Sequence, residues 1–104
     1  MKDLIQKLVD FRDARGWQKY HTEPELARSY MTEAAELNRL YQWGQIPEDE
    51  PLKEEIADGF IYLLYKCEKR GFDPIQIILE KIEKNAIKYP VFGAPEELKW
   101  NPKN

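Results

Sequence analysis

The stretch PLKEEIADGFIYLLYKCEKR, residues 51–70, decides the fold of this chain. Its second half is apolar on almost every side, and a helix with that pattern is a central, buried helix. Its first half carries carboxylates, of which Glu55 and Asp58 are three positions apart and share one face of a helix. Carboxylates rarely enter a protein interior unless they are paired or bind a metal. The stretch therefore predicts a central helix with an acidic site near its start.

Three further helices are predicted around this one. Apolar residues recur at helical spacing over residues 3–15, which indicates a first helix. Thr22, with a glutamate three positions later, is the signature of a capping box for a helix that should run over 22–43. Asp73, followed by a proline, predicts a last helix over 74–88. The residues between the first two helices, Trp17 to His21, are expected to form an aromatic-rich connection.

The start of the central helix carries its own signals. Asp49 or Glu50 can cap it, with Pro51 at or near its first position. Four amphipathic helices joined by short connections predict an all-α fold, a four-helix antiparallel bundle. The 104 residues are predicted to form a single domain, with a helical core at about 3–89 and an extended tail at 90–104.

Charge and composition exclude several classes of partner. The formal net charge is −3, which predicts no general attraction to polymeric nucleic acid. No apolar run approaches the ~20 residues of a membrane span, and the charged N-terminus does not resemble a signal peptide. The single Cys67 cannot form an internal disulfide and is expected to be a small buried apolar residue. We therefore expect a cytoplasmic protein without a membrane partner.

Two carboxylate pairs are the strongest chemical feature of the sequence. Glu33 and Glu36 repeat on the second helix the spacing of Glu55 and Asp58 on the third. Hard cations such as Mg²⁺ prefer oxygen ligands, and helical bundles often build metal sites from facing helices. Taken alone, each pair would more often be a solvated helix surface. No glutamate is followed three residues later by a histidine, and the lone His21 lies in a loop, so redox metals are not expected.

The aromatic and basic residues allow two interpretations. Trp17 and Trp43 are most simply core residues, but both occur at the ends of helices, where tryptophan can also stack on a base. Lys81, Lys84 and Lys88 form a stripe on the last helix that is either a solvated face or a contact for phosphate.

Taken together, these segments resemble the all-α nucleotide pyrophosphohydrolases, and more narrowly the MazG-like branch that includes the small dCTP pyrophosphatases. The resemblance covers nearly the whole chain, from about residue 11 to residue 91. Each short motif is weak alone, but their combination and order are specific. In chain order the matching segments are Trp17 with His21, Glu33-Ala34-Ala35-Glu36-Leu37, Gln42-Trp43, Glu55-Ile56-Ala57-Asp58, Lys81-Ile82-Glu83-Lys84-Asn85 and Lys88-Tyr89-Pro90-Val91.

The resemblance implies an activity and a metal site. Such enzymes hydrolyse a nucleoside triphosphate between its α and β phosphates and release the monophosphate and pyrophosphate. Mg²⁺, with Mn²⁺ as a substitute, would be held by the carboxylates that match the family motifs, Glu33, Glu36, Glu55 and Asp58. Glu36 is our candidate for the general base. The expected role is nucleotide-pool sanitation or a dCTP-type pyrophosphatase activity.

The resemblance also implies substrate contacts and an assembly. Lys81 and Asn85 match positions that contact the phosphates or the sugar, and Tyr62 matches another substrate contact. The base pocket would involve three further residues, Trp17, His21 and Trp43. Members form dimers or tetramers, and a site can draw residues from more than one subunit.

Two positions depart from the family pattern. Thr32 stands where many members carry a further glutamate, and Leu8 stands where some dCTP-preferring relatives carry a polar residue. Both leave the preferred base open. The alternative from another class is a non-catalytic helical module that oligomerises through its tyrosine- and tryptophan-rich faces and keeps a degenerate metal site. The intact carboxylates in both pairs argue against that alternative.

Overall fold

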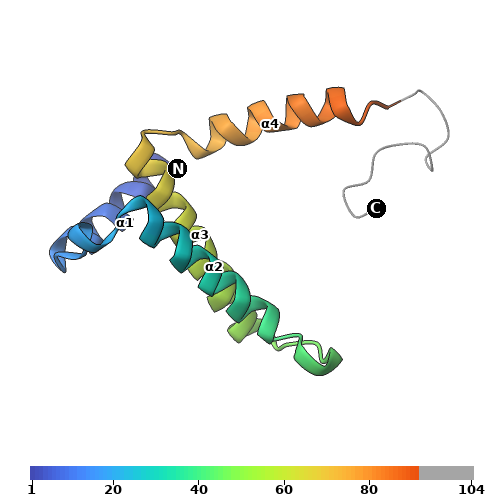
Figure 1. The fold of residues 1–104 in the computed structure, drawn as a ribbon, viewed down its shortest axis with the longest axis horizontal. Helices are drawn as coiled ribbons and strands as arrows, with labels where there is room; N and C mark the ends of the chain where they lie inside the picture. The colour runs from blue at the N-terminus through green and yellow to red at the C-terminus, as the bar shows by residue number, and fades with distance from the viewer. Residues whose placement is uncertain (92–104) are drawn as a thin grey trace. The chain divides into compact units, whose positions relative to one another are not determined.

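The computed structural model describes residues 1–91, in which all regular elements are helices (Figure 1). The predicted extended tail therefore lies, from residue 92 onward, outside the described residues. Within the described part no strand occurs, so the all-α class is confirmed. None of its helices is long and apolar enough to cross a membrane. The elements are α1 (Lys2–Ala14), η1 (Trp17–Tyr20), α2 (Glu23–Arg39), η2 (Gln42–Gly44), α3 (Asp49–Arg70) and α4 (Pro74–Lys88), where η denotes a short 3₁₀ helix.

The chain divides into two compact units. The first runs from Met1 to Phe72, and the second begins at Asp73 and contains α4. In the first unit α2 and α3 lie side by side and antiparallel, and α1 packs against α3 (Figure 1). The antiparallel helix packing that the sequence predicts is therefore present in the first unit. Whether the whole chain behaves as one domain stays a prediction.

Local sequence signals fix several helix ends as predicted. The Thr22 hydroxyl accepts a hydrogen bond from the backbone N–H of Glu25 and caps α2 at its start. The Asp73 carboxylate accepts from the N–H of Ile75 at 2.9 Å and caps α4. Gly16 follows α1 with a positive φ of 67°, a conformation that glycine adopts without steric cost. These caps satisfy backbone groups that helix ends leave without partners.

Two predicted helix boundaries are wrong. The second helix ends at Arg39 instead of running to Trp43, because the backbone tightens into i→i+3 hydrogen bonds there and Trp43 adopts a positive φ of 70°. Glu48, and not Asp49 or Glu50, occupies the N-cap position of the third helix, and its side chain makes no capping hydrogen bond. Pro51 is then its third residue, which is tolerated because the first four N–H groups of a helix have no intrahelical partner.

The core of the first unit is small. Among the described apolar side chains of this unit, only Leu26, Leu64 and Tyr65 are fully buried. The prediction that α3 is buried on nearly every side is therefore wrong, since Phe60 is 60% exposed and Leu63 is 40% exposed. Within this unit α3 is covered by α2 and by α1, and these two neighbours leave part of its apolar surface uncovered.

Candidate functional site

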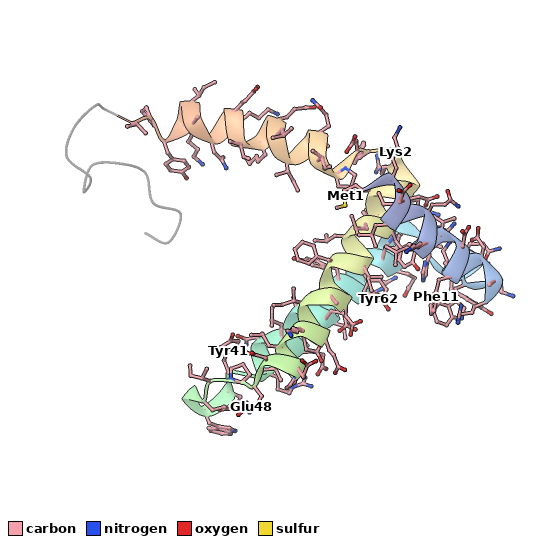
Figure 2. All side chains as sticks on the ribbon, turned by 180° about the vertical axis from the view of Figure 1, so that it is seen from behind. Met1, Lys2, Phe11, Tyr41, Glu48 and Tyr62 are labelled. Carbon is pink, nitrogen blue, oxygen red and sulfur yellow. The ribbon has the colours of Figure 1, made fainter. Side chains whose placement is uncertain are left out.

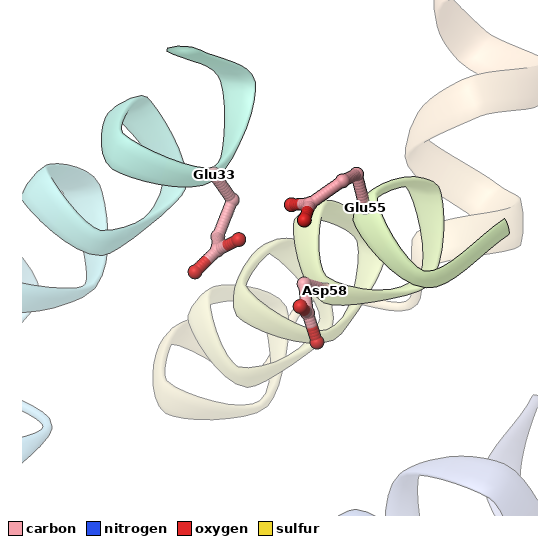
Figure 3. Close-up of side chains that lie close together, drawn as sticks. All are labelled: Glu33, Glu55 and Asp58. Atoms are coloured by element: carbon pink, nitrogen blue, oxygen red, sulfur yellow. The ribbon is translucent and has the colours of Figure 1, made fainter. Parts of the chain in front are cut away.

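Three carboxylates from α2 and α3 converge at one point (Figure 3). Glu33 comes from α2, while Glu55 and Asp58 come from one face of α3 because they are three residues apart. One carboxylate oxygen from each residue lies within 4.8 Å of the others. We call these three residues the acidic cluster. The sequence predicted that four carboxylates, these three and Glu36, would converge, from the spacing of the two pairs and from the family resemblance.

The acidic cluster is electrostatically strained in the metal-free protein. Burial raises the pKa of Glu33, and the nearby negative charges of Asp58 and Glu55 raise it further. The Oε2 atom of Glu55 is buried and has no hydrogen-bond partner among the described residues. A buried acceptor without a donor is unfavourable, so this oxygen is suited to a cation.

The donor atoms of the cluster determine which cation fits. All three side chains offer carboxylate oxygens, and no histidine or cysteine belongs to the cluster. Such a set suits hard divalent ions like Mg²⁺, which is commonly held by one or two carboxylates together with substrate phosphates. The residues present therefore fit a divalent metal.

Glu36, the fourth predicted ligand, lies outside the acidic cluster. It is one turn beyond Glu33 on α2, but its two carboxylate oxygens both accept from Nη1 of Arg39 at 2.8 Å. The structure thus brings together three of the four predicted carboxylates. The assignment of Glu36 as a ligand and as the general base stays a prediction.

A pocket of about 450 Å³ opens between α1, η1 and α3, directly beside the acidic cluster. Phe11 on α1 and Tyr62 on α3 mark its two sides in Figure 2. We call it the aromatic pocket, and Asp58 belongs both to its lining and to the acidic cluster. Its lining residues are Lys7, Leu8, Phe11, Trp17, His21, Asp58, Ile61, Tyr62 and Tyr65.

Trp17 and His21 both line the aromatic pocket, as predicted for the base-binding region. The Trp17 ring meets Phe11 edge to face, with ring centroids 5.6 Å apart. The His21 ring lies 4.9 Å from the Tyr65 ring, and its Nδ1 atom is buried without a partner among the described residues. Tyr62 also lines the pocket, so three predicted substrate contacts are brought together.

The His21 imidazole is held neutral at neutral pH. Burial lowers its pKa below the ordinary value of 6.5, and the positive charges of Arg12 and Lys69 lower it further. A neutral imidazole has one donor and one acceptor nitrogen. It can therefore make a directional hydrogen bond with the polar edge of a bound ring.

The other predicted contacts lie elsewhere. Trp43 is 90% exposed and does not line the aromatic pocket. The connection that carries it, between Tyr41 and Glu48, is at the opposite end of the α2–α3 pair from Phe11 (Figure 2). Lys81 and Asn85 lie on α4, which belongs to the second unit. The first unit alone therefore contains neither of them.

Five pocket residues were not predicted as site residues, namely Lys7, Leu8, Phe11, Ile61 and Tyr65. A signal for two of them was present in the sequence. Asp58, Ile61, Tyr62 and Tyr65 follow each other at the three- and four-residue spacing of one helix face. Extending the acidic face of α3 by two turns would have found Ile61 and Tyr65. Lys7, Leu8 and Phe11 belong to α1, and no local pattern links them to this face.

Known proteins were compared with the chain. No protein-family model matches it. It is 29% identical over 103 residues to dCTP pyrophosphatase 1 of Bos taurus and 27% identical over 100 residues to that of Homo sapiens. These matches cover 88% and 86% of this chain, but the chain spans only 60% and 59% of the length of these relatives.

A solved structure gives the stronger match. The crystal structure of a pyrophosphatase from Archaeoglobus fulgidus superposes with a TM-score of 0.80 at 42% sequence identity. The match covers 88% of this chain and 93% of the archaeal chain. Because fold and sequence agree over nearly the full length of that protein, the chain belongs to the same family of small all-α pyrophosphatases.

Proposed function

We propose that this chain hydrolyses a nucleoside or deoxynucleoside triphosphate, with Mg²⁺, to the monophosphate and pyrophosphate. One observation carries the proposal: the acidic cluster and the aromatic pocket adjoin and share Asp58. A nucleotide has the same two parts, an anionic phosphate chain that needs a cation and a flat ring that needs an apolar cleft. The names of the archaeal and mammalian relatives support this reaction class.

The acidic cluster would hold Mg²⁺, with Mn²⁺ as a substitute, through Glu33, Glu55 and Asp58. When bound, the metal neutralises phosphate charge and lowers the pKa of an attacking water. Glu36 can supply a fourth ligand or accept a proton only after its carboxylate turns away from Arg39. The chain would therefore hold three carboxylates beside the pocket, and the carboxylate of Glu36 would become available only after it leaves Arg39.

The aromatic pocket would receive the base. Trp17 offers a ring for stacking, and the neutral His21 offers a directional hydrogen bond. Tyr62 lies between the base and the acidic cluster along α3. Lys81 and Asn85 on α4 would meet the phosphates or the sugar. The residues that line the pocket would then determine which base and sugar are preferred. Both nucleotide-pool sanitation and a dCTP-type pyrophosphatase activity fit this arrangement.

We further propose that the active form is a homo-oligomer, a dimer or a tetramer, in the cytoplasm. Trp43 is exposed, and the connection that carries it, between Tyr41 and Glu48, lies at the opposite end of the α2–α3 pair from Phe11 (Figure 2). If it contacts the base, it reaches the pocket of another copy of the chain. The lone Cys67, which has no disulfide partner in the chain, fits a reducing compartment.

The proposal is tested by assaying pyrophosphate release from a panel of nucleotides with and without Mg²⁺. We expect pyrophosphate as the first product, and we expect Asp58→Asn to lose nearly all turnover because both subsites share this residue. Glu54→Gln removes a carboxylate four residues away on the same helix, outside the acidic cluster, and should keep wild-type turnover. Orthophosphate as the first product, or an active Asp58→Asn enzyme, would reject the reaction class or the site.

A further inference from the structure

Helix α1 forms one wall of the aromatic pocket, yet apolar burial hardly fixes its position. None of its residues is fully buried. Phe11, which lines the pocket, is 47% exposed. A helix of 13 residues is only marginally stable by itself in water, so its place depends on tertiary contacts. The position of α1 in the pocket wall therefore depends on its specific contacts with α3.

Two polar links join α1 to α3, and they are in register. The Tyr65 hydroxyl donates to the backbone carbonyl of Leu8 at 2.8 Å. One turn further along both helices, Nη1 of Arg12 donates to Oε2 of Glu68 at 3.1 Å. Leu8 itself lines the pocket, so the Tyr65 link acts directly on the pocket wall. The Arg12 link lies outside the pocket lining.

Tyr65 also contacts the second wall. Its side chain is buried, with 4% of the residue exposed, and its ring lies 4.9 Å from that of His21. His21 follows η1, the short helix that carries Trp17. Tyr65 thus contacts both walls of the pocket, Leu8 on α1 through its hydroxyl and His21 after η1 through its ring.

We propose that Tyr65 is the positioning residue of the aromatic pocket: it sets the separation of α1 and η1 from α3 and so determines how tightly a flat base is held. This inference rests on the proposed function only in naming the base as the ligand. Tyr65 is distant along α3 from the acidic cluster, so its action is on base affinity and not on the reacting phosphate. In the sequence, Tyr65 is only one of the tyrosines in the apolar second half of residues 51–70.

The test is Tyr65→Phe, which keeps the ring and its contact with His21 and removes only the link to Leu8. We expect KM for the nucleoside triphosphate to rise about threefold to tenfold, the worth of one hydrogen bond, with kcat unchanged. Affinity for the corresponding nucleoside, which has no phosphates, should fall by the same factor. Affinity for inorganic pyrophosphate with Mg²⁺ should not change.

A second readout needs no enzyme activity. In the ligand-free Tyr65→Phe protein, amide hydrogen exchange should accelerate over residues 2–14 and stay unchanged over α2. His21 is the only histidine in the chain, so its imidazole resonances are unambiguous in NMR spectra and should shift. Leu64→Val is the matched control, since Leu64 is equally buried on the same helix but does not line the pocket.

The outcomes separate this inference from the proposed function. A Tyr65→Phe protein with wild-type exchange over residues 2–14, or with an unchanged KM, overturns the positioning role. A rise in KM for Leu64→Val as large as for Tyr65→Phe would assign the effect to lost stability and would also overturn it. Altered exchange together with no pyrophosphate release from the wild type would reject the proposed reaction and leave the role of Tyr65 in shaping the pocket supported.

Discussion

Glu33 shows how a single side chain reports on the acidic cluster. Its pKa is raised by burial and then by Asp58 and Glu55, so its charged form is unfavourable in the folded protein. In the unfolded chain its pKa returns to about 4.5. Between these two pKa values the folded state binds more protons, and the stability therefore falls as the pH rises through this window. The destabilisation is fully present once the pH exceeds the pKa of Glu33 in the folded protein.

The first prediction is that removing this charge stabilises the metal-free protein. Glu33→Gln should melt higher than wild type in EDTA at about pH 7, by roughly 4–8 °C if about 1 kcal/mol of repulsion and desolvation is relieved. The difference should shrink as the pH is lowered toward 4.5, where wild-type Glu33 becomes protonated as well. Calorimetry across this pH range checks both statements. Glu54→Gln is the control and should move the melting temperature little.

The second prediction extends this to Asp58. Asp58→Asn should also melt higher than wild type in EDTA, because like charges in the cluster repel. With Mg²⁺ the order should narrow or reverse, since the metal stabilises only the folded protein that can bind it. Melting curves with EDTA and with Mg²⁺ test this. A variant that melts as wild type does in both buffers would show Asp58 to be an ordinary solvated carboxylate.

At the scale of elements, the connection between α2 and α3 contains a residue with an unusual backbone conformation. Trp43 has φ 70° within η2, a left-handed conformation that a bulky residue adopts only at some cost. A tryptophan that is 90% exposed in such a conformation contributes little to the packing of its own chain. The first unit therefore gains little stability from the Trp43 side chain.

The third prediction follows from this exposure. Trp43→Ala should fold with a melting temperature close to that of wild type, because almost none of the side chain is buried. Its KM should rise more than its kcat falls, since a base-stacking contact distant from the α phosphate acts as uniform binding. We expect a loss of roughly 1–3 kcal/mol. Steady-state kinetics beside a melting curve measures both. An unfolded variant would instead make Trp43 a core residue.

The elements also show what the sequence can and cannot predict. Thr22 and Asp73 place helix starts correctly because a cap is a local interaction within three residues. The end of α2 was missed because Trp43 continues the helical pattern while the backbone at this residue does not. The acidic cluster was predictable because three-residue spacing fixes a helix face. The α1 wall was not, because the Tyr65 to Leu8 link joins residues 57 positions apart.

At the scale of the whole molecule, many apolar side chains of α2 and α3 are exposed in the single chain. Besides Phe60 and Leu63 on α3, Tyr30 and Met31 on α2 are 40% and 66% exposed. Apolar patches of this kind mark protein interfaces, and aromatic residues are enriched at interface cores. The small buried core of the first unit points the same way.

The fourth prediction is therefore a homo-oligomer that buries part of α2 and α3. A stable interface buries about 800 Å² on each partner. Multi-angle light scattering at micromolar concentration should give at least a dimer. The charge-introducing variant Phe60→Glu should shift the mass toward the monomer, while Glu54→Gln should not. A monomeric wild type would contradict the prediction.

Asp58 has a further consequence because it lines the aromatic pocket and belongs to the acidic cluster. A cation at the cluster cancels negative charge on a pocket wall, and a ring in the pocket shields the same carboxylate from water. The two binding equilibria therefore share a coupling free energy, and thermodynamic reciprocity makes it equal in both directions. If Mg²⁺ raises the affinity for a nucleoside by some factor, the nucleoside raises the affinity for Mg²⁺ by the same factor. Under the proposed function, the chain would therefore retain its cation best while a nucleotide is bound.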